Sequence, residues 1–424
     1  MRTALVHEWF TALAGSESVV EQLCHLYPDA DLYAVYADAG VVAATDYLCD
    51  RRLQTSFIKH LPRAAQSFRS YLLLMPLAVE QFDLSPYDLV ISSSHAVAKG
   101  VLTGPNQLHI SYVHSPIRYA WDLQHQYLRE AHLDTGMKGW VAKWMLHRMR
   151  IWDYRTAAGV DHFVANSRYV ARRISKVYGR HADVIYPPVD VARFGLQEDK
   201  GDFYLAASRL VPYKRMDLIV EAFAAMPDKR LVVIGDGPEA DKVKAKAGRN
   251  VELMGYQPDD VLREMMQQAR AFVFAAEEDF GIIPVEAQAC GTPVIAFGKG
   301  GALETVRGPE REQPTGLFFY RQDAASIVDA VQQFEADYQR FEPKACRANA
   351  ERFSARRFAA EFEAYAEKCW NTFESKAPDE RALVNPGDSL VPDYPEYVPL
   401  RSGIPGVDDQ GDPFIEHERF HASG

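Results

Sequence analysis

Residues 277–295, EEDFGIIPVEAQACGTPVI, combine acidic side chains, a glycine and an apolar strand pattern within a short stretch. Glu278 and Glu286 lie on either side of Gly281, where a predicted strand gives way to a predicted helix. Two carboxylates beside a bound phosphate would repel it, but they are good acceptors for the hydroxyl groups of sugars. The spacing therefore fits a diphosphate with a sugar on each side, and solvated acids at the start of a helix are the alternative.

The helix in this stretch is predicted to begin with unpaired N–H groups. Pro284 falls in its first turn and Gly291 just past its end, which is the usual placement of these residues. The N–H groups around Gly281, Ile282 and Ile283 have no partner within the helix, so they form an anion site. Gly281 has no Cβ, which lets a phosphate approach the backbone.

The elements that must position these residues alternate between strand and helix along most of the chain. Helical patterns, such as 19–27 and 214–226, separate short apolar runs. This alternation predicts α/β architecture, with parallel sheets covered by helices on both faces. The runs that predict strands are 3–9, 88–94, 109–115, 162–168, 203–208, 230–237, 251–255, 271–276 and 293–297.

A break in this alternation near 186–204, which holds paired prolines and several charges, predicts a linker between two domains. We expect a first domain at 1–187, a second at 188–345, and helices at 346–374 that cross back to the first domain. Residues 375–424 hold seven prolines and a net charge of −6, and we expect an extended tail there. Paired doubly wound domains bind a ligand in the cleft between them, at the carboxyl ends of the strands.

Composition excludes several classes of protein. The net charge of −11 argues against a nucleic-acid partner, because phosphate binding needs a basic surface. The five cysteines include no C-x-x-C pair, which predicts neither a zinc site nor a disulfide framework. The first residues, MRTALVHEWF, enter a strand pattern without a signal peptide, and no apolar run is long enough to span a bilayer. We therefore expect a cytoplasmic protein.

These motifs together resemble glycosyltransferase family 4. Glu278 and Glu286 match the E-x7-E signature of that family, and Arg209 and Lys214 in SRLVPYKRMD match the Arg and Lys that grip the donor diphosphate. The resemblance covers roughly residues 1–372. It implies the GT-B fold, in which two doubly wound Rossmann-like domains face each other across a cleft. It also implies that Glu278 holds the donor sugar, that Glu286 holds the ribose, and that the two cations stabilise the departing diphosphate.

Other stretches resemble this family more locally. ALAGSESVV resembles a glycine-rich loop near the donor phosphate, but one of the two usual glycines is Ala14, so only Gly15 matches. VHSPIRYAW places His114 directly after a strand, where the family has a histidine that faces the reacting sugar. VELMGYQP, which contains Tyr256, matches a strand end near the nucleotide base. His95, in SSSHAVAKG, either lines the acceptor side or is structural.

The resemblance also implies a reaction. ISSSHAVAKGV and HSPIRYAWD are most similar to bacterial mannosyltransferases of polysaccharide assembly. We therefore expect a retaining glycosyltransferase that moves mannose from GDP-mannose to a lipid-linked oligosaccharide. The departing phosphate would take the proton of the acceptor. The alternatives are a UDP-sugar donor, a GT-B nucleotide-sugar epimerase and a regulatory protein that binds nucleotide sugars without turnover. No G-x-G-x-x-G follows the first strand of either domain, which argues against a dinucleotide-binding module.

No cofactor or metal ion is expected, because Arg209 and Lys214 already supply positive charge to the leaving group. Asp29 and Asp31, in PDADLY, have the spacing that glycosyltransferases of another fold use for a metal. They are far in sequence from every donor motif, and we retain them only as the alternative that a metal requirement would revive.

Two segments mix basic residues with aromatic and aliphatic ones. They are 55–78, TSFIKHLPRAAQSFRSYLLLMPLA, and 138–152, KGWVAKWMLHRMRIW. Such segments can lie at a membrane interface, where cations meet anionic lipid and aromatic rings reach the headgroups. We expect peripheral contact with the anionic inner face of the cytoplasmic membrane, where a polyprenyl-linked acceptor would be found. Ordinary amphipathic packing helices are the alternative.

Overall fold

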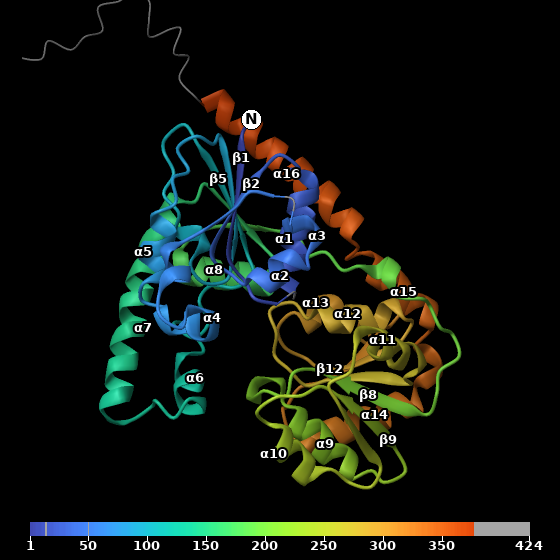
Figure 1. The fold of residues 1–424 in the computed structure, drawn as a ribbon. Coiled ribbons are helices and arrows are strands. Elements are labelled where there is room, and N and C mark those ends of the chain that lie inside the picture. Colours follow the sequence, from blue (N-terminus) through green and yellow to red (C-terminus); the bar gives the residue numbers. More distant parts are fainter. Residues whose placement is uncertain (13–14, 50, 377–424) are drawn as a thin grey trace, which may run out of the picture. The chain divides into compact units, whose positions relative to one another are not determined.

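The computed structural model describes residues 1–12, 15–49 and 51–376, and two parallel sheets form its framework (Figure 1). The first sheet has the strand order β3-β2-β1-β4-β5-β6-β7, and the second has the order β10-β9-β8-β11-β12-β13. The strands of the first are β1 (Thr3–Phe10), β2 (Asp31–Ala37), β3 (Leu53–Thr55), β4 (Leu89–Ser94), β5 (Leu108–Val113), β6 (His162–Ala165) and β7 (Ala182–Val184). Those of the second are β8 (Phe203–Ala207), β9 (Arg230–Ile234), β10 (Val251–Gly255), β11 (Ala271–Phe274), β12 (Val294–Phe297) and β13 (Gly316–Phe319).

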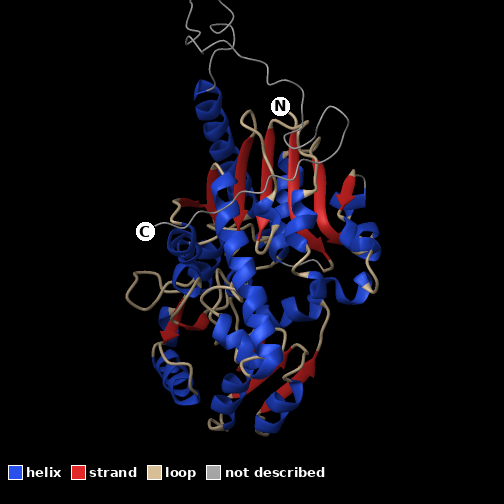
Figure 2. Cartoon of the chain, turned by 90° about the vertical axis from the view of Figure 1, so that its left-hand side faces the viewer, coloured by secondary structure: helices blue, strands red, loops and turns tan. Residues whose placement is uncertain are grey.

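Helices connect the strands, and Figure 2 shows them in blue on both sides of the red strands. In the first half they are α1 (Gly15–Leu26), α2 (Ala39–Ala43), α3 (Asp46–Cys49), α4 (Ala64–Ser67), α5 (Met75–Glu80), α6 (Gln124–Glu130), α7 (Gly136–Thr156) and α8 (Arg168–Tyr178). In the second half they are α9 (Met216–Ala224), α10 (Ala240–Lys246), α11 (Asp259–Gln268), α12 (Ile282–Ala289), α13 (Ala302–Thr305), α14 (Ala324–Ala336), α15 (Pro343–Glu351) and α16 (Ala355–Lys376).

The two sheets confirm the predicted doubly wound α/β architecture, and each of the nine predicted strands overlaps an observed one. The central strands read as apolar runs because they are covered on both faces; every residue of β4, β5 and β8 is buried. Four further strands were not predicted: β3, β7 and β13, which have three or four residues, and β2, which has seven. Of the predicted tail, residues 377–424 lie outside the described part of the chain.

The last two helices belong to different cores. Ala345, Cys346 and Ala350 of α15 are buried, and Ala350 packs in a cluster with residues of the second sheet. Phe358 and Phe362 of α16 pack instead beside Tyr112 and Leu5, in the core of the first sheet. The two segments that connect the halves meet where Val189 N donates to Phe353 O over 2.8 Å. The chain therefore passes between the two sheets twice, at neighbouring points.

In the described residues, no helix is both long enough and apolar enough to cross a bilayer.

Candidate active site

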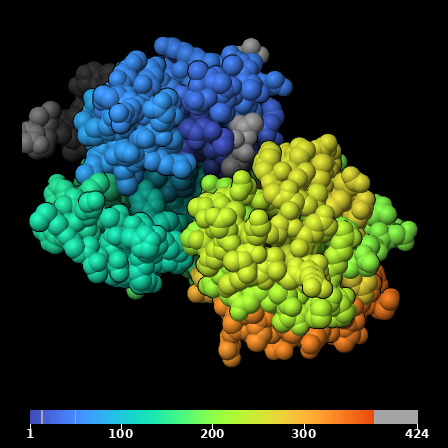
Figure 3. Space-filling model, turned by 60° about the horizontal axis from the view of Figure 1, so that its bottom comes forward, coloured from blue at the N-terminus to red at the C-terminus, as the bar shows by residue number. Residues whose placement is uncertain are grey.

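The strand orders locate the candidate site. In each sheet the order changes direction at its first strand, between β1 and β4 and between β8 and β11. Ligands of open parallel sheets bind at such points, beyond the carboxyl ends of the strands. A cavity of about 980 Å³ lies there, between the half that Figure 3 colours blue to teal and the half coloured green to yellow. Residues that follow β1, β4, β5, β8 and β11 line it.

Nearly all the site residues predicted from the sequence line this one cavity. Tyr256 does not; its side chain is 78% exposed, beyond the end of β10. Those in the lining are Gly15, His95, His114, Arg209, Lys214, Glu278, Gly281, Ile282, Ile283 and Glu286. They come from segments more than 250 residues apart, which the two sheets bring together.

The start of α12 has the geometry of an anion site. Gly281 is its N-cap residue and has a φ of 87°, in the left-handed region that only glycine adopts readily. No side chain in the described part of the chain caps the helix, so its first N–H groups remain available. Gly15 lies directly opposite, since a Cβ there would be 2.4 Å from Cδ1 of Ile282. Glycine at position 15 therefore allows the starts of α1 and α12 to approach each other.

The three consecutive acids 277–279 have three different environments. Glu278 turns to the cavity, where an Oε1 atom contacts the Nζ atom of Lys214. Glu277 accepts a hydrogen bond of 2.6 Å from the hydroxyl of Tyr169. Asp279 forms ion pairs with Arg173 at 2.5 Å and with Arg118 at 3.3 Å. Glu277 and Asp279 thus connect the second half to the first, while Glu278 is left to meet a ligand.

The cations of the site crowd one another. Burial lowers the pKa of Lys214, and the charges of Arg209 and Arg118 lower it further, while its contact with Glu278 acts in the opposite direction. The guanidinium of Arg209 is exposed to the cavity and has no hydrogen bond or ion pair among the described side chains. A diphosphate in this position would relieve the repulsion between these cations, because it carries the opposite charge.

Glu286 lies on α12, one turn from its start, and its carboxyl reaches the cavity. Burial raises its pKa to about 7, and the charge of Asp259 adds to this while that of Arg193 opposes it. No ion pair or side-chain hydrogen bond of Glu286 exists within the described residues. Its carboxyl is therefore free to accept hydrogen bonds from ligand hydroxyls, although half of the molecules are protonated near neutral pH.

His114 follows β5 and is held by its neighbours in the first half. One ring nitrogen, Nε2, lies 2.8 Å from the hydroxyl oxygen of Ser93, and its carbonyl accepts a hydrogen bond from Asn166. Burial lowers its pKa to about 3, with further lowering by the nearby His95 and His7. The imidazole is therefore neutral at physiological pH, so it can hydrogen-bond to a sugar hydroxyl but does not add positive charge.

Glu8 is a site residue that the sequence analysis missed. Its carboxylate is fully buried; Oε1 accepts hydrogen bonds of 2.8 to 3.1 Å from the backbone N–H groups of residues 95–98. Its Oε2 lies 3.0 Å from Nδ1 of His95. Burial acts to lower the pKa of His95, but the carboxylate of Glu8 outweighs burial and the pKa is raised. Glu8 therefore favours the protonated form of His95, which lines the cavity. The sequence did contain a signal for Glu8, because it is an acidic residue within the otherwise mostly apolar strand 3–10.

Asp29 and Asp31 lie where the strands of the first sheet begin, at the amino end of β2. Asp31 is the first residue of β2, and its carboxylate accepts a 2.5 Å hydrogen bond from the hydroxyl of Tyr87. The candidate site lies at the carboxyl ends of the strands, whereas these two acids lie at the amino end of β2. The full length of β2 therefore separates them from the site.

Two family models match the chain and together span most of it. One, described as "Glycosyl transferases group 1", matches residues 190–353, and the other, described as "Glycosyltransferase Family 4", matches residues 13–193.

Curated relatives match a part of the chain. A GDP-mannose-dependent monoacylated alpha-(1-6)-phosphatidylinositol monomannoside mannosyltransferase from Corynebacterium glutamicum is 33% identical over an alignment of 178 residues, gaps included, that covers 35% of this chain and 47% of that protein. A D-inositol 3-phosphate glycosyltransferase from Mycobacteroides abscessus is 27% identical over an alignment of 197 residues that covers 40% of this chain and 43% of that protein. The chain thus matches less than half the length of these relatives.

Solved structures share the whole two-domain framework. Sucrose-phosphate synthase from Thermosynechococcus elongatus superimposes with a TM-score of 0.65 and 17% identity, over 88% of this chain and 100% of that one. HepE from Anabaena, solved with UDP, gives a TM-score of 0.64 and 17% identity, over 87% of this chain and 100% of that one. At this identity the likeness concerns the fold alone, and it confirms the predicted GT-B arrangement.

Proposed function

We propose a function for this chain, which belongs to glycosyltransferase family 4. It is a retaining glycosyltransferase, and it moves a hexose from a nucleotide diphosphate sugar to an acceptor. The observation that most supports this is a single cavity whose lining brings together Arg209, Lys214, the uncapped start of α12 and the carboxylates of Glu278 and Glu286. Cations and N–H groups suit a diphosphate, and the carboxylates suit the hydroxyls on its two sides.

In the proposed reaction the bond between the sugar and the diphosphate breaks, and negative charge develops on the departing phosphate. Arg209, Lys214 and the start of α12 would stabilise that charge, since they are fixed before the reaction begins. Lys214 now contacts Glu278, so donor binding would replace this partner with phosphate and free Glu278 for the sugar hydroxyls. The phosphate would take the proton of the acceptor hydroxyl that attacks from the same face.

For the donor we propose GDP-mannose. The support is that the Corynebacterium relative is described as GDP-mannose-dependent and as a mannosyltransferase. A UDP-sugar is the alternative donor. No metal ion is needed in this proposal, because side-chain cations face the leaving group.

The test of this function is a donor screen with purified protein. We expect nucleoside diphosphate to be released from GDP-mannose when a lipid-linked glycan acceptor is added, and at an unchanged rate in EDTA. Turnover of the donor without an acceptor would indicate an epimerase, and donor binding without turnover would indicate a regulatory protein. A strict need for Mg²⁺ or Mn²⁺ would contradict the metal-free mechanism and revive Asp29 and Asp31.

The two carboxylates of the site should have separable roles. In Glu278→Gln, we expect lower turnover with nearly unchanged binding of the free nucleoside diphosphate, since this side chain is assigned to the sugar. In Glu286→Gln, we expect the free nucleotide to bind about tenfold more weakly, because hydrogen bonds to a charged acceptor are lost. Isothermal titration calorimetry and initial rates measure the two effects. Equal losses of nucleotide affinity in both variants would contradict this division.

Glu286→Gln should also make the unliganded protein more stable. A carboxyl whose pKa rises from 4.5 to about 7 on folding costs stability above pH 7 and costs none below 4.5. Glutamine carries no charge, so at pH 8 we expect a gain of about 1–2 kcal/mol, and no gain at pH 4.5. In wild type, affinity for the nucleotide should rise between pH 6 and 8 as Glu286 ionises. Urea denaturation at both pH values measures the change in stability.

For the acceptor we propose a lipid-linked glycan, which the enzyme would reach by peripheral contact with an anionic membrane. Helix α7 supports this proposal, because large apolar side chains are exposed along one stripe of it; Trp140 is 68% exposed and Met137 is 84% exposed. Contiguous exposed apolar stripes commonly mark an interaction surface. Lys138, Lys143 and Arg148 are exposed beside it, which favours an anionic surface.

We expect the protein to sediment with anionic liposomes at low salt and to be released at high salt. Each basic side chain near the surface contributes about 1 kcal/mol, which ionic screening removes. Lys138→Glu, Lys143→Glu and Arg148→Glu together should abolish sedimentation. Arg150 is unsuitable for this test, since it is half-buried and its guanidinium donates to the carbonyl of Ala120. Lys143 also donates to a carbonyl, that of Asp134, but its side chain is exposed.

The matched control changes three exposed cations elsewhere, Lys244, Arg249 and Arg356, to glutamate. It alters the net charge equally and should still sediment. Transfer to a short soluble acceptor should be unchanged in both triple variants. If the wild type ignores anionic liposomes, or if both variants lose binding equally, α7 is not a membrane-contact surface.

A further inference from the structure

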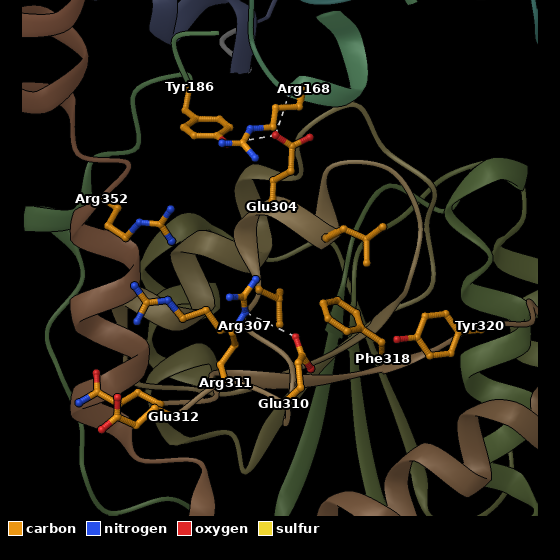
Figure 4. A pocket seen from close by; sticks show the side chains of 13 residues that line it. Arg168, Tyr186, Glu304, Arg307, Glu310, Arg311, Glu312, Phe318, Tyr320 and Arg352 are labelled. Carbon is orange, nitrogen blue, oxygen red and sulfur yellow. Dashed lines mark hydrogen bonds and ion pairs between the residues drawn. The ribbon is translucent and has the colours of Figure 1, made fainter. Parts of the chain in front are cut away.

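A second cavity, of about 770 Å³, lies apart from the candidate active site and shares no lining residue with it (Figure 4). Both halves of the chain contribute to it. The first half contributes Arg168, at the start of α8, and the linker contributes Tyr186. The second half contributes α13, the loop after it, β13 and the residue that follows α15.

Three arginines of this cavity lack a neutralising partner. In the described part of the chain, no carboxylate lies within ion-pair distance of Arg168, Arg307 or Arg352. The one side-chain hydrogen bond among them joins Nη1 of Arg352 to Oδ1 of Asn349 over 2.8 Å. Burial lowers the pKa of Arg352, and the charges of Arg307 and Arg168 contribute to the lowering. Positive charge therefore accumulates here at a cost in free energy.

Two of the three acids of the cavity are already engaged, and the third, Glu312, is exposed and lies beyond ion-pair distance of the described arginines. Glu304 accepts hydrogen bonds from the backbone N–H groups of Arg168 and Tyr169, at 2.8 and 2.9 Å, and from the hydroxyl of Tyr186 at 3.1 Å. Glu310 lies 3.7 Å from Arg311. Glu304 thus caps the start of α8 across the two halves, which leaves its charge already engaged. An anion from outside is the partner that the remaining guanidinium groups lack.

The walls of the cavity differ in chemistry. Figure 4 shows Arg307, Arg311 and Arg352 on one side and the rings of Phe318 and Tyr320 on the opposite side. Guanidinium groups bind phosphate oxygens through paired hydrogen bonds, and aromatic rings pack against the faces of sugars and bases. The volume is in the range of small-molecule sites, which is roughly 300–1,000 Å³.

We infer that this cavity is a second binding site, for a small phosphate ester. Arg168, Arg307 and Arg352 bind its phosphate. Phe318 and Tyr320 contact its ring. This site is independent of the reaction proposed above, because no residue of the candidate active site takes part in it.

The test is calorimetric titration of the full chain with glucose 6-phosphate, with inorganic phosphate and glucose in parallel. We expect glucose 6-phosphate to bind at one site, inorganic phosphate to bind more weakly, and glucose not to bind. Arg307→Ala combined with Arg352→Ala should raise the Kd for glucose 6-phosphate at least about tenfold, which is the size of losing one charged hydrogen bond. Thermal unfolding without ligand should be unchanged or occur at a higher temperature, because like charges are removed.

Two control variants locate the bound probe. Arg356→Ala removes an exposed arginine on α16 that does not line the cavity, and it should leave the Kd unchanged. Arg209→Ala weakens the candidate active site and should also leave it unchanged. Loss of binding in Arg209→Ala, with retention in the double variant, would place the probe in the other cleft and overturn the inference. Absence of binding by both anions would overturn it as well. If the double variant unfolds, Arg307→Gln replaces it in the same comparison.

Discussion

Replacing Arg209 or Lys214 by alanine is expected to slow sugar transfer by about 100-fold to 1,000-fold, the usual effect of removing one fixed group that stabilises developing charge. Both side chains line the cavity beside the start of α12, and no described carboxylate pairs with Arg209. The effect should fall mainly on kcat, because the charge on the leaving diphosphate increases as the bond to the sugar breaks. Initial rates at saturating and limiting donor separate kcat from KM.

Arg230→Ala provides the control for this prediction. Arg230 lies at the beginning of β9, at the amino edge of the same sheet, and pairs there with Glu252 at 2.8 Å. Its loss should leave the transfer rate within about twofold of wild type, since exposed pairs contribute little. Wild-type rates in both Arg209→Ala and Lys214→Ala would exclude the assigned diphosphate site, whatever the true donor is.

Glu8→Ala should destabilise the protein by about 3–5 kcal/mol, because it leaves several buried N–H groups and the half-buried His95 without their acceptor. Chemical denaturation measures this loss. Glu8→Gln keeps an oxygen that can accept the N–H groups of residues 95–98 but carries no charge for His95. We therefore expect a smaller loss in this variant, and a fall in transfer rate if charged His95 faces the acceptor.

The pH dependence of stability distinguishes the ion pair between Glu8 and His95 from the hydrogen bonds that Glu8 accepts. The pKa of His95 is raised above its ordinary 6.5 in the folded protein, so its stabilisation is complete below that pH and is lost as pH rises through the raised value. Glu8→Gln should therefore lose most stability relative to wild type below pH 6.5, and less at high pH. A loss that does not vary with pH would contradict the ion pair and leave only the hydrogen bonds.

The parts of the site that could be predicted are those whose residues lie close together in the sequence. Glu278, Gly281 and Glu286 belong to one strand-to-helix junction, and short sequence spacing determines which of them meet the same ligand. Arg209 and Lys214 belong to a second junction of this kind, between β8 and α9, and β8 is the neighbour of β11 in the sheet. The two sheets then bring these junctions together, which an alternation of strands and helices is enough to predict.

The contacts that could not be predicted join distant segments. Nothing near Glu8 in sequence shows that its carboxylate accepts N–H groups some 90 residues away. Glu277 and Asp279 look equivalent to Glu278 in sequence, yet their partners are Tyr169 and Arg173, more than 100 residues earlier. Tyr256 lies just past the end of β10, as the strand pattern predicts, but it is exposed and does not line the cavity.

The double passage of the chain between the two sheets has a consequence for attempts to dissect it. A protease cut within 190–200 would sever one connection and leave the other, through residues 352–355, intact. The halves would also stay joined by α16, whose Phe358 and Phe362 are fully buried in the first core. A truncation that ends at residue 187 removes α16 and uncovers that apolar surface. The first half expressed alone would consequently be prone to aggregate, whereas two fragments produced together have what they need to reassemble by complementation.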